Sequence, residues 1–185
     1  MQERLRGAID ARPGALRLIS MCAGEGRDVA GVLRDHPRRG EISVRLVELD
    51  PRNAEVARAA VAAAGLERVE VVEADAAETD SYAGAVPAEI ILACGVFGNI
   101  SDEDVRHTIE RLPCFAADGA TVIWTRGRER ERDAALVIRE WFVASGFVEV
   151  AFDAPDDARF RVGVHRLVVA PRPFERGMRL FRFLR

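Results

Sequence analysis

The feature that most constrains this chain is an apolar run that ends in two closely spaced glycines. Residues 16–21 have the composition of a buried strand, Gly24 and Gly26 follow one residue apart, and an apolar helical pattern begins at Val29. Glycine has no Cβ, so the chain can turn sharply here and bring its backbone close to a ligand. A helix behind such a turn directs free N–H groups into the same space. This order of elements predicts either a plain strand-to-helix turn or a nucleotide-like cofactor at the carboxyl edge of a parallel sheet.

The rest of the chain alternates between strand and helix patterns. Strands are predicted at residues 15–21, 42–48, 69–73, 88–94, 120–125, 147–152 and 162–170. Helices are predicted at residues 2–11, 27–35, 53–64 and 134–145, and another is predicted to begin after the capping residue Ser101. Alternation of this kind gives a mostly parallel sheet with helices on both faces. The last two strands are joined only by a short acidic turn at 153–157, so they are predicted to form an antiparallel hairpin at one edge.

The composition excludes several classes of protein. With 27 basic and 30 acidic residues, the formal net charge of −3 gives no general attraction for nucleic acid. No apolar run approaches the roughly 20 residues that cross a bilayer, and the charged residues 1–12 do not resemble a signal peptide. Three widely spaced cysteines, Cys22, Cys94 and Cys114, predict a reduced cytoplasmic protein without a disulfide framework or a zinc site. The three histidines are also far apart in the sequence, which argues against a metal enzyme.

Residues with ligand-binding chemistry follow four successive strands. The first strand leads into the glycine turn. The second ends at Glu48, about two dozen residues beyond Gly24, where a carboxylate can accept hydrogen bonds from both hydroxyls of a ribose. The third is followed by Asp75, which is suited to accept from the exocyclic amine of a purine. The fourth is followed by Gly95 and Phe97, which would line the reacting end of the site. Each acidic residue alone could equally cap a helix, but together the four strand ends predict a single cleft.

These residues give the chain a resemblance to the class I S-adenosylmethionine-dependent methyltransferases over nearly its whole length. The segments that carry the resemblance are 22–28 (CAGEGRD), 47–50 (VELD), 73–76 (EADA) and 91–103, with 117–120 in place of the turn before the fifth strand. The resemblance implies a Rossmann-like α/β three-layer sandwich with a seven-stranded, mostly parallel sheet and an antiparallel last strand. It implies one domain over 1–185, with a short N-terminal helix within 1–14 and a C-terminal tail at 171–185.

The same resemblance implies that S-adenosylmethionine is the cofactor and that a methyl group is transferred to an acceptor. It assigns cofactor binding to Cys22, Ala23, Gly24, Gly26, Glu48, Leu49, Asp50, Asp75, Ala76, Gly95 and Phe97. Glu48 takes the ribose role, with Asp50 as the competing assignment. Cys22 stands where the family usually has an acidic residue that helps to hold the methionine ammonium. The helical lid of many members would be short, absent or outside this sequence, because only about fourteen residues precede the first strand.

The sequence offers no decisive catalytic base. Asn99, after the fourth strand, could orient an acceptor, and His165 could act as a base, although a structural histidine is the favoured interpretation. Trp124 and Arg126 end the fifth strand and could form a wall of the acceptor site. Residues 95–98 read Gly-Val-Phe-Gly, so the Asn-Pro-Pro-Tyr segment of many amino-methylating nucleic-acid enzymes is absent. Together with the mild net charge, this favours a small-molecule acceptor.

Two other functions remain open. A NAD(P)-binding oxidoreductase would need the pattern Gly-x-Gly-x-x-Gly, but Val29 stands where the third glycine belongs. A catalytically silent relative that acts through binding is compatible with Cys22 and with the missing base. The alternating residues 178–184 of the tail could add an edge strand or cover a partner subunit in a homodimer. A tail that packs on the surface of its own chain is the simpler interpretation.

Overall fold

The computed structural model describes residues 1–127, 134–155 and 158–184. The strands are β1 (Leu16–Met21), β2 (Ile42–Glu48), β3 (Val69–Glu73), β4 (Ala88–Ala93), β5 (Ala116–Gly127), β6 (Phe147–Asp153) and β7 (Phe160–Leu167). The α-helices are α1 (Gln2–Asp10), α2 (Arg27–Leu33), α3 (Pro51–Ala63), α4 (Asp102–Arg111) and α5 (Ala134–Ala144). Part of the predicted acidic turn, residues 156–157, lies outside the described residues.

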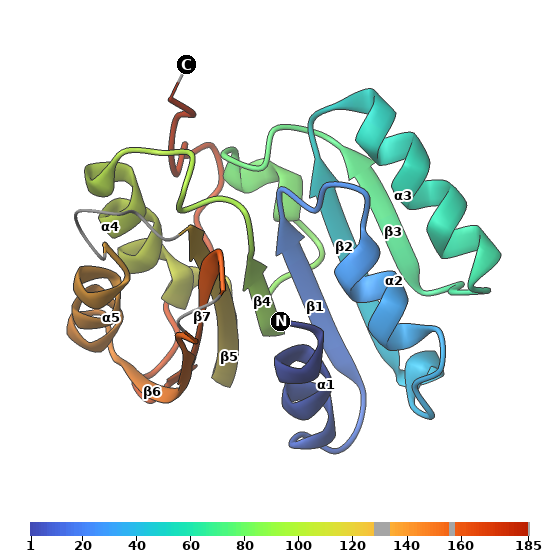
Figure 1. The fold of residues 1–185 in the computed structure, drawn as a ribbon, viewed down its shortest axis with the longest axis horizontal. Coiled ribbons are helices and arrows are strands. Elements are labelled where there is room, and N and C mark those ends of the chain that lie inside the picture. Colours follow the sequence, from blue (N-terminus) through green and yellow to red (C-terminus); the bar gives the residue numbers. More distant parts are fainter. Residues whose placement is uncertain (128–133, 156–157, 185) are drawn as a thin grey trace.

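The seven strands form one sheet in the order β3-β2-β1-β4-β5-β7-β6. The neighbours from β3 to β5 are parallel, whereas β7 runs antiparallel to both β5 and β6. Figure 1 shows α2 and α3 over the β1–β3 half of the sheet and α4 and α5 beside the other half. The apolar side chains of α1–α3 and those of α4 and α5 belong to two separate core clusters, one for each face of the sheet. The predicted three-layer α/β fold with its antiparallel hairpin is therefore confirmed.

Two strands have bounds that differ from the prediction by more than one residue, β5 and β7. β5 begins at Ala116 rather than at residue 120, because Ala116 pairs with Ala88 before the register shifts to Thr121 opposite Ile90. Gly119 takes a φ of +64° within the extra residues of β5. A turn-forming Asp-Gly pair is thus accommodated inside an irregular strand instead of preceding a regular one. The second difference is in β7. This strand covers residues 160–167 and therefore begins and ends closer to the N-terminus than the predicted range of 162–170.

A fully buried tryptophan joins β5 to β7. Trp124 lies opposite Gly163 in the antiparallel register, and a Cβ at Gly163 would lie 2.2 Å from the indole ring. The ring stacks on Phe142 with centroids 5.9 Å apart, and its Nε1 donates a hydrogen bond to His165 Nδ1 at 3.1 Å. The prediction that Trp124 forms a wall of the acceptor site is wrong, because none of its surface is exposed.

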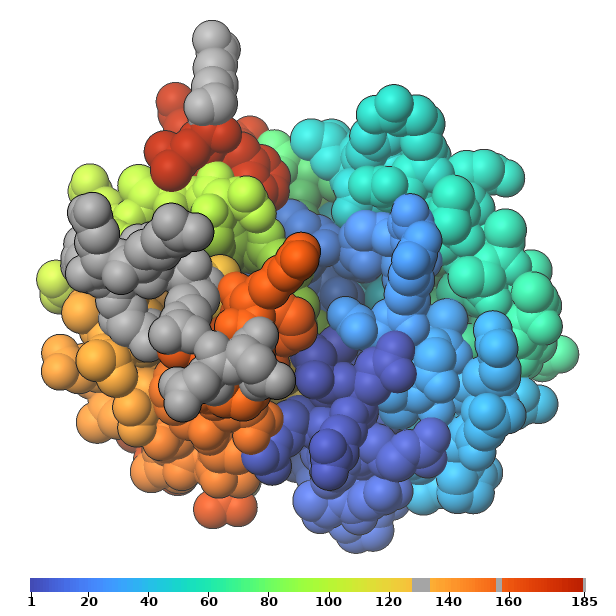
Figure 2. Space-filling view, viewed as in Figure 1, coloured from blue at the N-terminus to red at the C-terminus, as the bar shows by residue number. Residues whose placement is uncertain are grey.

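The C-terminal tail lies along the carboxyl edge of the sheet and packs against its own chain. Leu180 and Phe181 are each about 1% exposed, so the tail contributes two side chains to the core. Its backbone makes two isolated bridges, Arg179 with Glu78 and Phe183 with Ile100, and does not add an edge strand. Figure 2 shows the tail in red against the yellow-green β4–α4 loop at the top of the molecule.

No helix within the described ranges combines the length and the apolar character that a membrane span requires.

His165 should make the stability of the fold dependent on pH. Burial lowers the pKa of His165 from its ordinary value of 6.5 to about 4, because the fully buried ring accepts charge poorly. The unfolded chain therefore takes up the proton first, so stability is complete above about pH 6.5 and is lost as the pH falls toward 4. The loss should reach on the order of 3 kcal/mol by pH 4.

Urea unfolding between pH 4 and pH 7 measures this effect. His165→Gln is the matched variant, since its side-chain oxygen can still accept from Trp124 Nε1 but does not titrate in this range. The variant should lose stability less steeply below pH 6.5 than the wild type. Parallel pH profiles for the two proteins would contradict the assignment to His165.

Candidate functional site

The two glycines of the first turn serve different purposes. Both take a positive φ, +56° at Gly24 and +67° at Gly26. A Cβ at Gly26 would lie 3.1 Å from Leu46 Cδ1 and 3.3 Å from Ala57 Cβ, so close packing against β2 and α3 requires glycine there. A Cβ at Gly24 would meet nothing within 4 Å. The Gly24 backbone therefore borders open space at the carboxyl end of β1, where a ligand can approach it.

Glu48 connects the end of β2 to this turn. Its Oε2 accepts a hydrogen bond from Gly24 N at 2.7 Å, and its Oε1 accepts from Asp50 N at 2.9 Å. The residue is 8% exposed, so these bonds hold a nearly buried carboxylate in one orientation. A carboxylate oxygen can accept more than one hydrogen bond, and Glu48 thus keeps capacity for donors on a ligand.

Asp50, the competing acidic residue, caps α3. Its Oδ1 accepts from Arg52 N at 2.9 Å, and its carboxylate forms an ion pair with the Arg52 guanidinium at 2.7 Å. The side-chain hydrogen bond from Arg52 lowers the pKa of Asp50 to about 2. These contacts are those of a helix N-cap, so Glu48 is better suited to the ribose role. The neighbouring Leu49 is 56% exposed.

Cys22 and Asp75 belong to the same electrostatic neighbourhood as Glu48. Burial, together with the nearby carboxylates of Glu48 and Asp75, raises the pKa of the Cys22 thiol to about 12. Cys22 therefore stays a neutral thiol at physiological pH. Cys22 has a φ of +52° and is the one non-glycine residue with a positive φ among the described residues. It lies directly before the glycine turn.

Asp75 follows β3 and is held on both carboxylate oxygens. Oδ1 accepts from Ala77 N at 2.9 Å, and Oδ2 is 3.0 Å from Nη2 of Arg179 in the C-terminal tail. The side chain keeps 28% of its surface exposed, whereas Ala76 beside it is buried. Sequence reasoning missed Arg179, because nothing in a basic tail indicates a contact across 104 residues.

The end of β4 forms a second open turn. Gly95 has a φ of +80°, and a Cβ there would meet nothing within 4 Å. Its N–H donates to Thr125 Oγ1 at 2.9 Å, and its carbonyl accepts from Asn99 Nδ2 at 2.6 Å. Phe97 is fully buried and packs near Trp124, with ring centroids 6.1 Å apart, so it supports the turn from below. The buried Arg126 donates to the Phe97 carbonyl oxygen.

The structure thus brings most of the predicted site residues to one edge. The set at this edge comprises Cys22, Ala23, Gly24, Gly26, Glu48, Asp75, Gly95 and Asn99, from the ends of β1, β2, β3 and β4. His165 is not part of this set. It is fully buried, and its ring stacks on Phe142 with centroids 4.3 Å apart. A structural role for this histidine follows, in line with the favoured interpretation of the sequence.

The donor and acceptor chemistry of this edge limits the kind of ligand that fits. Glu48 and Asp75 offer carboxylate oxygens, which accept hydrogen bonds and favour positive charge. A ligand that donates from hydroxyl and amine groups and carries a cationic centre would be complementary. A pyrophosphate would instead bring negative charge toward two carboxylates. Among the described residues, no group of side chains has the arrangement of a metal site.

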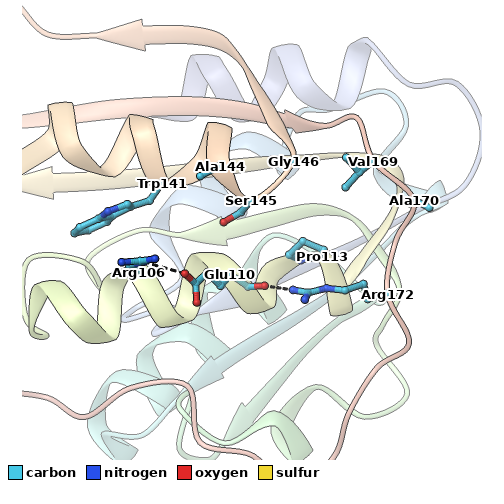
Figure 3. Close-up of a pocket in the computed structure, with 10 residues that line it drawn as sticks. All are labelled: Arg106, Glu110, Pro113, Trp141, Ala144, Ser145, Gly146, Val169, Ala170 and Arg172. Atoms are coloured by element: carbon cyan, nitrogen blue, oxygen red, sulfur yellow. Dashed lines mark hydrogen bonds and ion pairs between the residues drawn. The ribbon is translucent and has the colours of Figure 1, made fainter.

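Two hollows in the structure do not provide the ligand space of this site. A cavity of about 30 Å³ beneath the glycine turn, bordered by Cys22, Asp28 and Cys94, has room only for water. A groove of about 560 Å³ lies between α4, α5 and the start of the tail. Figure 3 shows Trp141 and Arg172 among the residues that line it. That groove lies at the C-terminal ends of α4 and α5, at the opposite edge of the sheet from Glu48 and Asp75.

Comparison with known proteins relates the chain to one group. A family model described as "Putative methyltransferase" matches residues 2–128. A structure of an O-methyltransferase family protein from Burkholderia thailandensis has a TM-score of 0.72 at 18% identity, covering 90% of this chain and 55% of that one. Magnesium protoporphyrin IX methyltransferase from Synechocystis PCC 6803, solved with bound S-adenosylmethionine, has a TM-score of 0.69 at 11% identity, covering 90% and 77%.

The chain therefore spans only about half the length of the first of these structures. CalO1, a methyltransferase in calicheamicin biosynthesis solved with S-adenosylhomocysteine, has a TM-score of 0.61 at 18% identity, covering 89% of this chain and 52% of that one. At these identities the structures establish a shared fold. The comparison with curated proteins gave no match.

Proposed function

This chain belongs to the methyltransferase family whose model matches residues 2–128, and it has the fold of the class I enzymes. From that membership we propose that it uses S-adenosylmethionine to transfer a methyl group to a small organic acceptor. The observation that carries the proposal is the hydrogen bond from Gly24 N to Glu48 Oε2 at 2.7 Å. It joins the glycine turn after β1 to a nearly buried carboxylate after β2, where a Cβ on Gly24 would meet nothing within 4 Å. Asp75 after β3 and Gly95 after β4 extend the same edge.

The residues present suit S-adenosylmethionine. Glu48 would accept hydrogen bonds from the ribose hydroxyls, and Asp75 would accept one from the exocyclic amine of adenine. The Gly24 backbone would lie against the amino-acid arm, where a Cβ would take up the open space. Both carboxylates favour a cationic ligand. Cys22 supplies no charge for the ammonium, which would rely on backbone carbonyls and on the field of Glu48 and Asp75.

The cofactor supplies an electrophilic methyl group on a sulfonium centre. The protein's own contribution is to bind, to orient the acceptor and to exclude water. Gly95 and Asn99 would lie on the acceptor side, because they follow β4, next to β5. The hydrogen bonds of Gly95 with Thr125 and Asn99 fix this turn, and the exposed Asn99 could orient a polar acceptor. No described side chain at this edge is a strong base, so an acceptor that needs little proton removal is favoured.

Charge and motif support a small-molecule acceptor over nucleic acid. The net charge of −3 gives no general attraction for a polyanion, and residues 95–98 differ from the segment of amino-methylating nucleic-acid enzymes. We also propose that residues 1–185 form a single domain and that the protein is cytoplasmic. The second point rests on the three cysteines, which are all free thiols. A homodimer remains a prediction.

A catalytically silent relative that binds the cofactor is the second candidate. Cys22 favours it, because a neutral thiol replaces the acidic residue that the family usually has at this position. A NAD(P)-dependent oxidoreductase fits less well, since Val29 is 2% exposed in the core where a third glycine would be needed.

Titration calorimetry with S-adenosylmethionine, S-adenosylhomocysteine and NAD separates these functions. We expect both adenosyl ligands to bind and NAD to give no heat. Methyl transfer from labelled S-adenosylmethionine to a small-molecule panel then distinguishes the enzyme from the silent relative. Binding of NAD alone would support the oxidoreductase, and binding of none of the three would contradict the proposal.

Replacing Cys22 by aspartate should raise the affinity for S-adenosylmethionine about tenfold. Aspartate tolerates the φ of +52° at this position and would provide a counter-charge for the ammonium. Calorimetry on Cys22→Asp and on Cys22→Asn, which has the same shape without the charge, measures the effect. The asparagine variant should bind like the wild type. A lower affinity for the aspartate variant would mean that the site is adapted to a neutral residue.

A further inference from the structure

The last residues of the described chain form a strap between two loops of the candidate site. We define the C-terminal strap as residues 176–184. Toward the loop after β3, Leu180 N donates to Ala77 O at 2.7 Å, and Thr79 N donates to Met178 O at 2.9 Å. Toward the loop after β4, Leu184 N donates to Asn99 O at 2.9 Å. The strap therefore connects two loops that the proposed function assigns to the cofactor and the acceptor (Figure 1).

The strap is held firmly at the point where it passes Asp75. Leu180 and Phe181 are buried in the core formed with α4 and α5. The residue before them, Arg179, points its guanidinium at the loop after β3. Arg179 Nη2 lies 3.0 Å from Asp75 Oδ2 and 2.6 Å from Glu78 Oε1. Because its backbone neighbours are anchored, this arginine has less freedom to move away than an ordinary surface side chain.

Arg179 completes the set of contacts that fix the Asp75 carboxylate. Oδ1 of Asp75 is held by Ala77 N, and Oδ2 is held by Arg179, so the plane of the carboxylate is set from two sides. The carbonyl oxygen of Ala77 accepts a hydrogen bond from Leu180 N of the strap. Ala77 therefore contacts both the Asp75 carboxylate and the strap that carries Arg179. Each oxygen still has a lone pair for a further donor, and 28% of the side chain remains exposed.

We propose that Arg179 is a positioning residue that orients the carboxylate of Asp75. In this orientation Asp75 selects a base with an exocyclic amine, such as adenine, over a base that has a carbonyl oxygen at the same position. The inference rests on the proposed function, because it assumes that Asp75 faces the adenine. Fixing an acceptor in advance removes the cost of ordering it on binding. Without Arg179, the carboxylate would have to be ordered on binding, so an adenosyl ligand should bind roughly 3- to 10-fold more weakly.

A general stabilising role does not explain this arginine as well. Ion pairs between exposed side chains contribute little to stability, and the Arg179 side chain is 41% exposed. The strap also contains a matched pair that does not touch Asp75. Arg176 Nε donates to Asp80 Oδ1 at 2.5 Å, three residues earlier in the strap. Arg176→Ala is therefore the control for loss of one guanidinium from the strap.

The test compares two ligands by titration calorimetry, S-adenosylhomocysteine and S-inosylhomocysteine, in which a carbonyl oxygen replaces the exocyclic amine. The wild type and Arg176→Ala should both prefer the adenosyl ligand. In Arg179→Ala, affinity for the adenosyl ligand should fall roughly 3- to 10-fold while affinity for the inosyl ligand stays the same or rises. Arg179→Lys keeps the charge and should recover part of the preference. Equal melting temperatures for the two alanine variants would exclude a difference in folding.

Three outcomes would overturn the inference. Tighter adenosyl binding by Arg179→Ala would make Arg179 a competitor of adenine, and an equal loss for both ligands would make it a general contact. An unchanged preference would remove Arg179 from base recognition. If the wild type binds S-adenosylhomocysteine, any of these results leaves the proposed function intact. If the wild type binds neither ligand, the proposed function fails and this inference fails with it.

Discussion

Replacing Glu48 by alanine should lower the affinity for S-adenosylhomocysteine by about 100-fold or more. Two hydrogen bonds from ribose hydroxyls to a charged acceptor would be lost, each worth about 1.5–3 kcal/mol. The substitution also removes the acceptor that holds Gly24 N at 2.7 Å, so the glycine turn loses its link to β2. Titration calorimetry on the folded variant measures the effect.

The structure supplies a control for the loss of a carboxylate that holds a backbone amide. Glu89 Oε2 accepts from Arg17 N at 2.7 Å near the starts of β4 and β1, at the opposite edge of the sheet. Glu89→Ala should therefore lose a comparable bond and keep the wild-type affinity. Glu48→Gln, which retains one oxygen without the charge, should bind more weakly than the wild type and more tightly than Glu48→Ala. Wild-type affinity in Glu48→Ala would remove the ribose role from this residue.

Replacing Gly163 by alanine should destabilise the protein by at least about 3 kcal/mol. The new Cβ would lie 2.2 Å from the Trp124 ring, and that ring is fully buried and stacked on Phe142. Neither the ring nor the backbone of β7 can yield without disturbing the antiparallel pairing. A decrease in melting temperature of about 6–12 °C is expected for a chain of this size.

Two further variants make the test specific. Gly127→Ala lies in the same strand pair, where a Cβ would meet nothing within 4 Å, and should change stability by no more than about 0.5 kcal/mol. In the double variant Gly163→Ala with Trp124→Phe, the smaller ring leaves more space. It should lose less stability than the sum of the two single changes. A wild-type melting temperature for Gly163→Ala would contradict the observed contact between β5 and β7.

Much of the fold could be predicted because local patterns and global topology agree. The apolar run before Gly24 and the apolar stretch of 90–94 indicated buried parallel strands, and the lack of a helix between the last two strands indicated a hairpin. The prediction failed where the outcome depends on which strands pair with each other. Whether Trp124 faces a ligand or the core is decided by Gly163 on another strand, which no local pattern reveals.

The candidate site was predictable to a similar extent. Glu48 and Asp75 could be identified because acidic residues at the ends of parallel strands meet at one edge. The hydrogen bonds of these residues could not be predicted. The choice between Glu48 and Asp50 for the ribose role depends on which carboxylate caps α3, and in the structure Asp50 does so. Arg179 could not be found either, because its contact with Asp75 depends on how the tail returns to the sheet.

The central claim is that the ends of β1 to β4 together bind one S-adenosyl ligand. A crystal structure of the protein grown with S-adenosylhomocysteine tests it most directly. We expect the ribose hydroxyls within hydrogen-bond distance of Glu48, the adenine amine at Asp75 and the amino-acid arm along the Gly24 backbone. Ligand density at the groove between α4 and α5, with the Glu48 carboxylate facing only protein, would contradict the account.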